Sequence, residues 1–273
     1  MPGLALIGNL VKDVVAGAPP RPGGAVYYQA RALAVTGRAA GVRAVTRCAG
    51  ADRTALLEPL ERFGLPVAWQ SGSETQAFSF HYEGEHRIMN VTALGDPWTA
   101  ADVEGWAGEA IGDAGWIVLG ALTRADFSPR ALAALRTGGR RLLVDAQGLV
   151  RLGRLGPLRI DGALHPEQLL GVQALKLNEL EAGILARSTE PEALRQLGVP
   201  EVVLTLGSQG AVVVTSSLAE HVPAETIDGP VDPTGAGDTF WIVYLTARRG
   251  GAEPVEAARA ASAATARMLA GEL

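Results

Sequence analysis

The chain has little cysteine, little histidine and little excess charge, and each shortage excludes a class of protein. Its single cysteine, Cys48, cannot form an internal disulfide, and its apolar, strand-like surroundings favour a core thiol over a catalytic one. The four histidines show no ligand spacing with carboxylates or with the cysteine, which argues against a zinc site. Charged residues make up 19% of the chain and its net charge is −5, so we expect no nucleic-acid partner.

Long apolar runs are also missing. No stretch of about 18 apolar residues occurs, so we expect no membrane-spanning helix and no membrane partner. The first eight residues contain neither a basic segment nor a long apolar stretch and do not read as a signal peptide. We therefore expect a cytoplasmic protein. Hydrophobic residues still make up 48% of the 273 residues, enough for one large α/β domain over residues 1–273.

Short apolar runs alternate with helical patterns along most of the chain. The runs predict strands at Leu4–Gly8, Ala44–Cys48, Trp116–Gly120, Leu142–Asp145, Ala174–Leu177, Val202–Leu206 and Val212–Thr215. The other pattern predicts helices at Gly24–Val35, Asp52–Phe63, Ala100–Ile111, Ser128–Arg136, Glu179–Ala186, Gly235–Arg248 and Val255–Leu269. Several strands are apolar on both faces, so we expect a mostly parallel sheet covered by helices on each side, a three-layer α/β/α fold.

One segment departs from this alternation. Ala77–Tyr82 and His86–Val91 are strand-like and separated by three residues, which predicts a hairpin without an accompanying helix. A hairpin inserted into an α/β domain is typical of a lid over a ligand. The Pro- and Gly-rich segment 16–24 can pack beside it, so we expect small lid strands around 14–22 and 76–92. Arg87 on the hairpin can contact a substrate, although a surface arginine is the commoner case.

The most informative motif is the segment from Asp232 to Asp238, which reads Asp-Pro-Thr-Gly-Ala-Gly-Asp and opens a helical pattern. Its glycines let the backbone approach a ligand closely, and unpaired N–H groups at a helix start attract anions. A carboxylate would repel a phosphate that is merely bound. Asp238 makes chemical sense if it takes a proton from a nucleophile that attacks the phosphate, so the motif indicates phosphoryl transfer.

The two common nucleotide-binding fingerprints do not explain this site. The first strand runs into Gly8-Asn9-Leu10-Val11-Lys12-Asp13, which lacks the spacing of a dinucleotide-binding turn. Gly-Lys followed by Ser or Thr does not occur, which excludes a P-loop. The phosphate site therefore lies late in the chain and belongs to another fold.

Four segments in consistent order resemble the PfkB-type, or ribokinase-like, carbohydrate kinases: Asp232–Phe240, Asn178 with Glu181, Thr205–Gly210, and Gly23-Gly24. The resemblance implies a ribokinase-like α/β/α domain with a small β lid. It also implies a Mg²⁺-dependent kinase that transfers the γ-phosphate of ATP to a hydroxyl of a sugar or cyclic polyol. Shorter matches are similar to the myo-inositol kinase branch: Gly8-Asn9 with Asp13, Val144–Gln147 with Arg151, and Leu175-Lys176.

The resemblance implies a role for each residue of the main motif. Asp238 is expected to be the general base for the acceptor hydroxyl, and the N–H groups of Gly235, Ala236 and Gly237 to form an anion hole for the transferring phosphoryl group. We expect the helix start to keep Asp238 ionised near neutral pH, so that it accepts the proton late, as the P–O bond forms.

The nucleotide and metal residues each have a structural alternative. Asn178 and Glu181 are implied to lie near Mg²⁺, but the same spacing makes a helix capping box. The resemblance places Thr205, Gly207, Ser208 and Gly210 beside the nucleotide, although such a segment also makes a tight hairpin turn. We further expect Thr234 at the nucleotide.

The acceptor residues are expected where α/β sheets bind ligands, after the strands. A carboxylate at Asp13 can accept hydrogen bonds from vicinal hydroxyls, with Asn9 beside it, and Gln147 follows another strand. Gly23 and Gly24 are implied to let the acceptor approach a helix start. Tyr28 stands where ribokinase has an asparagine, which argues against ribose.

Some alternatives stay open at this point. Trp241-Ile242-Val243 replaces the small residues usual in the family after the catalytic Asp, which leaves room for a catalytically quiet sugar- or nucleotide-binding regulator. A kinase of a nucleoside or another small hydroxylated metabolite is the rival within enzymes. The resemblance also allows a monovalent cation and a homodimer, which the residues do not decide.

Overall fold

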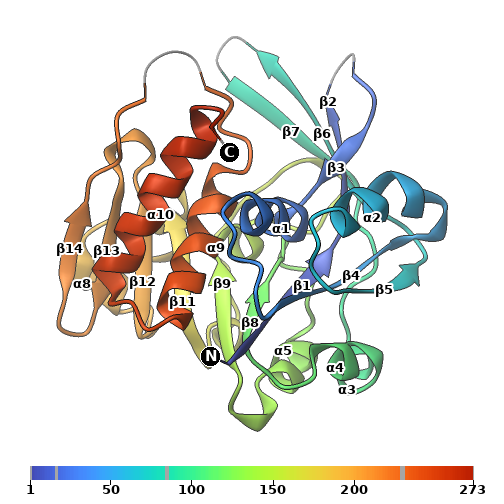
Figure 1. Cartoon of the computed structure of the whole chain (residues 1–273), viewed down its shortest axis with the longest axis horizontal. Coiled ribbons are helices and arrows are strands. Elements are labelled where there is room, and N and C mark those ends of the chain that lie inside the picture. Colours follow the sequence, from blue (N-terminus) through green and yellow to red (C-terminus); the bar gives the residue numbers. More distant parts are fainter. Residues whose placement is uncertain (1, 16–17, 84–85, 228–230, 273) are drawn as a thin grey trace.

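A nine-stranded sheet forms the centre of the molecule, seen in a computed structural model that describes residues 2–15, 18–83, 86–227 and 231–272 (Figure 1). Its strand order is β14-β13-β12-β11-β9-β8-β1-β4-β5. The strands are β1 Gly3–Asn9, β4 Val42–Ala49, β5 Val67–Gly72, β8 Ala114–Leu119, β9 Arg141–Asp145, β11 Val172–Asn178, β12 Glu201–Thr205, β13 Ala211–Thr215 and β14 Ala219–Val222. All neighbouring strands from β12 to β5 pair in parallel. Within this sheet, only β13 pairs antiparallel, with β12 on one side and β14 on the other, so the predicted mostly parallel sheet is confirmed.

Helices cover both faces of this sheet. One layer contains α1 Ala25–Val35, α2 Arg53–Glu61, α9 Ala236–Arg249 and α10 Pro254–Leu269. The other contains α3 Ala100–Glu104, α4 Trp106–Ile111, α5 Pro129–Leu135, α7 Glu179–Leu185 and α8 Pro191–Arg195. Successive residues of β1 point to opposite layers: Leu4 and Leu6 pack in the first core cluster, Ala5 and Ile7 in the second. The three-layer prediction is confirmed.

Local sequence explains where the helices begin and break. The Ser128 hydroxyl accepts a hydrogen bond from the Ala131 N–H at 3.1 Å, as expected of the cap before Pro129. The helix predicted over Ala100–Ile111 is divided at Gly105, whose backbone is not helical. The bulky residues after Asp238 lie in the core, because Trp241, Ile242 and Val243 have no exposed surface.

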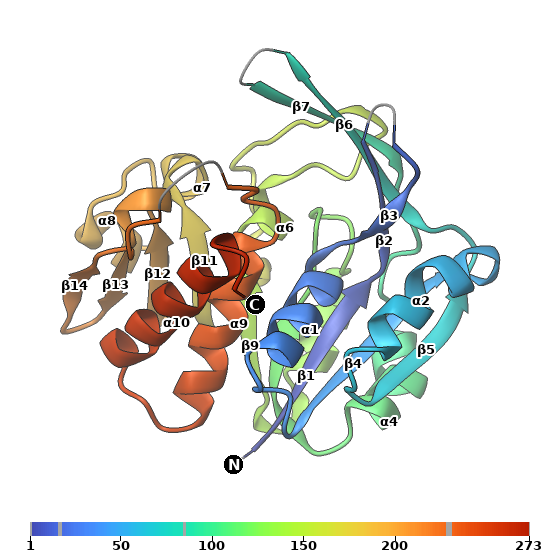
Figure 2. The same cartoon turned by 45° about the horizontal axis from the view of Figure 1, so that its top comes forward.

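A second sheet of five strands lies above the carboxyl ends of the central strands, as Figure 2 shows. Its order is β10-β7-β6-β2-β3, with β2 Val11–Val15, β3 Arg21–Gly23, β6 Gln76–Glu83, β7 His86–Ala93 and β10 Gly156–Pro157. β6 and β7 pair antiparallel, so the predicted lid hairpin is confirmed. The lid strands expected around 14–22 correspond to two separate strands, β2, which begins at Val11, and β3, which ends at Gly23.

The lid is directly continuous with the sheet. Leu10 alone separates β1 from β2, and Val11 packs in a small core with Phe78, Val91 and Leu122. Residues 16–17 and 84–85 and the side chain of Arg87 lie outside what the structure describes. Over the described residues, no helix combines the length and apolar character that crossing a membrane requires.

Candidate active site

The site lies where the carboxyl ends of the parallel strands meet. Asn9 ends β1, Asp145 ends β9, Asn178 ends β11 and Thr205 ends β12, so four polar side chains share one edge of the sheet. Helix α9 begins at the same edge, and α6, Gln147–Val150, follows Asp145. The lid covers this edge from above.

The turn before α9 requires glycine at position 235. Gly235 is in the left-handed conformation with φ 82°, and a Cβ there would lie 2.9 Å from Cδ1 of Tyr28. Before it, the Thr234 N–H donates to Oδ1 of Asp232 at 2.9 Å, which shapes the loop.

The three amides predicted to form an anion hole are not equivalent. The Ala236 N–H donates to the Pro233 carbonyl at 3.0 Å, so its hydrogen is used inside the turn. Among the described residues, the N–H groups of Gly235 and Gly237 have no such acceptor and remain for a ligand. This arrangement narrows the anion-hole candidates to Gly235 and Gly237.

Asp238 is half-buried in the first turn of α9 and is held from α1. Gln29 Nε2 donates to Asp238 Oδ1 at 3.2 Å. Burial and the nearby Asp145 carboxylate raise the pKa of Asp238 to about 7, against the opposing effects of Lys176, the Gln29 hydrogen bond and Arg151. The expectation that the helix start keeps Asp238 fully ionised at neutral pH is therefore wrong.

Lys176 lies in the site, although no role was predicted for it from the sequence. Its ammonium lies 2.7 Å from Oδ2 of Asp145, and the side chains are 8% and 3% exposed. A Cβ on Gly237 would lie 3.2 Å from Lys176 Nζ, so the ammonium sits beside the start of α9. Although burial lowers the pKa of Lys176, the carboxylates of Asp145, Glu181 and Asp238 raise it above its usual value, so this lysine is a cation. A lysine inside an apolar strand was the available signal, because lysine is almost never buried unpaired.

Asn178 and Glu181 form a capping box. The Asn178 N–H donates to Glu181 Oε2, and the Glu181 N–H donates to Asn178 Oδ1, each at 2.9 Å. The structural alternative is thus confirmed, while the metal role stays a prediction. The capping contacts use one oxygen of each side chain, Asn178 Oδ1 and Glu181 Oε2, so the cap does not involve Glu181 Oε1. Within the described ranges, no group of three or more His, Cys, Asp or Glu side chains is arranged to hold a metal.

The predicted acceptor residues come together between β2 and α1. The Tyr28 hydroxyl donates to Asp13 Oδ2 at 3.3 Å, and burial raises the pKa of Tyr28. Gly23 makes room for this carboxylate, since a Cβ there would lie 2.3 Å from Asp13 Oδ2. Gly24, with φ 87°, begins α1, and a Cβ there would lie 2.8 Å from Cγ2 of Val11.

Asn9 and Gln147 lie at the edges of this group. Asn9 is buried and its Nδ2 donates to the Asp96 carbonyl at 3.1 Å. Asn9 Oδ1 is buried without a hydrogen-bond partner among the described residues, which leaves it for a hydroxyl or a water. The Gln147 N–H donates to Asp145 Oδ1 at 3.2 Å, and the Gln147 side chain is half-buried.

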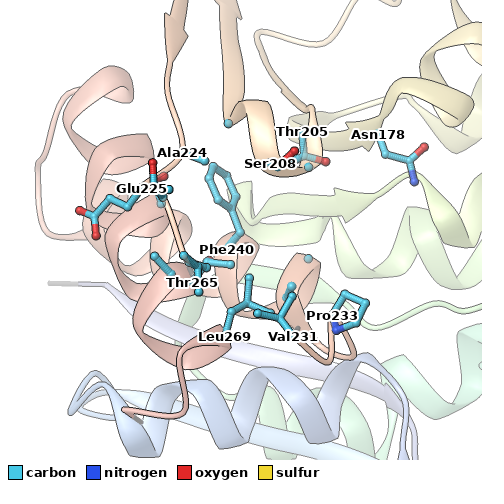
Figure 3. Close-up of a pocket in the computed structure, with 18 of the residues that line it drawn as sticks. Asn178, Thr205, Ser208, Ala224, Glu225, Val231, Pro233, Phe240, Thr265 and Leu269 are labelled. Atoms are coloured by element: carbon cyan, nitrogen blue, oxygen red, sulfur yellow. The ribbon is translucent and has the colours of Figure 1, made fainter. Parts of the chain in front are cut away.

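A cavity of about 790 Å³ lies on the other side of the start of α9 (Figure 3). Four of the five predicted nucleotide residues line it: Thr205, Gly207, Ser208 and Gly210. Asn178 lines it as well. Ala236 and Gly237 also line it. Thr234 does not; it borders a separate small hollow with Tyr28 and Thr239, and its place at the nucleotide stays a prediction.

The cavity also has an apolar wall that sequence reasoning missed. Its lining includes Leu180, Ile227, Val231, Phe240 and Leu269, and Figure 3 shows Val231 beside Leu269. Leu180 is 62% exposed and Val231 is 40% exposed, so both present apolar surface to the cavity. The tertiary arrangement creates this wall, since its residues come from distant parts of the chain.

The fold places the glycine turn before α9 between the polar group under the lid and the large cavity, an arrangement that suits phosphoryl transfer. The model of the pfkB family carbohydrate kinases matches residues 19–270. The chain therefore belongs to the PfkB carbohydrate kinase family.

Known proteins share the fold at low sequence identity. One solved structure is a pyrophosphate-dependent kinase in the ribokinase family complexed with a pyrophosphate analog and myo-inositol; it is 21% identical, has a TM-score of 0.80, and the match covers 97% of this chain and 94% of that chain. A sulfate complex of a pyrophosphate-dependent kinase in the ribokinase family is 21% identical with a TM-score of 0.83, over 97% and 95%. The ribokinase of Staphylococcus aureus (strain COL) is 31% identical over 87 residues, which are 29% of this chain and 28% of that protein.

Proposed function

We propose that this protein transfers the γ-phosphoryl group of a nucleoside triphosphate such as ATP to a hydroxyl of a sugar or cyclic polyol, with myo-inositol as the first candidate. One observation carries the proposal: Asp238 stands at the start of α9 between two different sites. Gly235 contacts Tyr28 of the acceptor group, and Gly237 lines the large cavity. A carboxylate in that position can meet a hydroxyl from one side and a phosphate from the other.

The transfer needs one base and stabilisation of negative charge. The acceptor oxygen attacks the γ-phosphorus, its proton passes to the Asp238 carboxylate, and the bond to the leaving nucleoside diphosphate breaks. A pKa of about 7 suits this role, because a general base works best near the operating pH. The N–H groups of Gly235 and Gly237 and the Lys176 ammonium face the charge that develops. Mg²⁺, held through water by Glu181 beside Asn178, would neutralise charge on the donor phosphates.

The shape and charge of the cavity favour a nucleotide over pyrophosphate. Its volume of about 790 Å³ is that of a site for a drug-sized ligand. The described residues of its lining include Glu179 and Glu225 but no Lys or Arg. Pyrophosphate is small and highly charged and would need cations there, whereas a nucleobase would cover Leu180 and Val231. The two pyrophosphate-dependent kinases described above are each only 21% identical to this chain, so their donor need not be the donor used here.

The acceptor group favours neighbouring hydroxyls. Asp13 offers carboxylate oxygens, the Tyr28 hydroxyl can donate or accept, and Asn9 Oδ1 is buried without a described partner. A polyol with vicinal hydroxyls satisfies these groups better than an acceptor with one isolated hydroxyl, because each buried polar group must find a partner.

The test is a donor and acceptor panel on the purified protein with Mg²⁺. We expect ADP release from ATP with a cyclic polyol or sugar, and little phosphoryl transfer from pyrophosphate. Phosphorylation from pyrophosphate without turnover of ATP would overturn the donor assignment, and ADP release only with nucleosides would overturn the acceptor class.

A pair of variants tests the pocket itself. Leu180→Glu should raise the KM for ATP more than tenfold and leave the KM for the acceptor unchanged, since a charge there opposes an apolar base and the donor's phosphates. Leu170→Glu is the matched control, because Leu170 is 61% exposed but does not line the cavity. Equal behaviour of the two variants would contradict the proposal that the base lies against Leu180.

A further inference from the structure

Gln29 is the one side chain of α1 that reaches the proposed base. It has no exposed surface, and its Nε2 donates to Asp238 Oδ1 at 3.2 Å across 209 positions of the chain. Its Oε1 is buried and has no hydrogen-bond partner among the described residues. A glutamine buried with an unsatisfied oxygen destabilises the fold, so its presence calls for a compensating role.

The amide has little freedom to move. Helix α1 begins directly after Gly24 and packs against α9, and its Tyr28 ring, one residue before Gln29, lies against Gly235. The buried neighbours Val26, Ala30 and Leu33 fix the same helix in the core. Nε2 rather than Oε1 faces the carboxylate, because the reverse orientation would place two oxygens face to face.

Several charged or titratable groups surround Asp238 from other elements. Asp145 comes from the end of β9, Lys176 from β11, Arg151 follows α6, and Tyr28 lies on α1. These groups act on Asp238 through space, whereas Gln29 donates a hydrogen bond to it. Gln29 therefore differs from the others in fixing the orientation of the carboxylate as well as its charge.

We propose that Gln29 is a positioning residue for the base: its amide fixes Asp238 Oδ1, leaves Oδ2 for the acceptor hydroxyl, and favours the ionised carboxylate that must receive the proton. This inference rests on the proposed function for its catalytic consequence. The alternative is that the amide only joins α1 to α9. That alternative predicts lower stability without a change in how Asp238 titrates.

The experiment follows the Asp238 carboxyl directly in the full-length protein. Aspartate labelled with ¹³C at the carboxyl carbon gives one signal per residue, and Asp238→Asn identifies the signal of interest. In Gln29→Leu we expect the titration midpoint of Asp238 to rise by about one pH unit or more, because a hydrogen bond to the charged form is lost. Gln29→Met, of similar length and also apolar, replaces it if Gln29→Leu does not fold.

Leu33→Ala is the control, since Leu33 is equally buried one turn further along α1 and makes no described contact with Asp238. It should lower stability and leave the midpoint unchanged. The acid limb of kcat/KM for the acceptor should move with the midpoint in the Gln29 variants, while the KM for ATP stays constant. An unchanged midpoint in a folded Gln29 variant would overturn the inference and leave the kinase proposal standing. If the midpoint rises in the Gln29 variants but the wild-type protein phosphorylates no acceptor, the inference about Gln29 stands and the kinase proposal is overturned.

Discussion

Replacing Asp238 with asparagine should abolish most turnover and, above neutral pH, make the protein more stable. Asparagine keeps the size of the side chain, and its Oδ1 can still accept the hydrogen bond from Gln29. Loss of a general base slows the reaction by about 10²- to 10⁴-fold. The gain in stability arises because the wild-type carboxylate is held where ionisation is unfavourable.

The magnitude follows from linkage between proton binding and folding. Asp238 has a pKa of about 7 in the folded protein, against about 3.9 in an unfolded chain. The folded state therefore retains a proton that the unfolded state has lost, and wild-type stability falls as the pH rises from about 4 to about 7. Roughly three pH units correspond to at most about 4 kcal/mol. Solvent screens part of this because Asp238 is only half-buried, so we expect Asp238→Asn to be more stable by about 1–2 kcal/mol at pH 8.

The assay is denaturant unfolding of both proteins between pH 4 and pH 8.5, with ADP release measured on the same samples. The difference in unfolding free energy should vanish near pH 4 and level off above pH 7. Asp113→Asn is the control, since the Asp113 side chain is 89% exposed and lies far from the site in the sequence and the fold. Equal stability of wild type and Asp238→Asn at every pH would refute the raised pKa, and near-normal turnover would remove Asp238 from the mechanism.

Three further substitutions test the groups around the base. Tyr28→Phe removes the hydrogen bond to Asp13, so the KM for the acceptor should rise several-fold while stability changes by about 1 kcal/mol and the KM for ATP stays the same. Gly235→Ala should lose activity and about 1–3 kcal/mol of unfolding free energy, because a Cβ meets the Tyr28 ring; Gly251→Ala, at φ 95° with open space around it, measures the backbone cost alone. Lys176→Met removes the ion-pair partner of the buried Asp145, so the free energy of unfolding should fall by about 3–5 kcal/mol. Adding Asp145→Asn should restore stability but not turnover. Recovered turnover in the double variant would show that Lys176 is only structural.

Patterns within single elements predicted most of the fold. Runs such as Leu4–Gly8 and Ala174–Leu177 appear as strands within one or two residues, because burial on both faces leaves an unmistakable apolar run. β3 and β10 are three and two residues long, too short for any periodicity to show. β5 and β14 are only partly buried and lack the apolar signal of the central strands.

The site was predictable where a motif is contiguous and not where distant segments meet. Asp238 and the glycines before it are adjacent in sequence, so the helix start was evident. The pairing of Lys176 with Asp145, and the hydrogen bond from Gln29 to Asp238, join residues from different elements. The raised pKa of Asp238 depends on its burial and on the Asp145 carboxylate, which no local pattern encodes.

The close approach of Tyr28 to Gly235 has a consequence for changing what this enzyme accepts. A bulkier or differently angled side chain at position 28, introduced to admit a new acceptor, would push on the glycine turn before α9. Selection experiments that randomise position 28 alone should therefore yield mostly variants with low activity. Position 235 cannot relieve this pressure, because glycine is already the smallest residue, so libraries should keep Gly235 and favour side chains no larger than tyrosine at position 28.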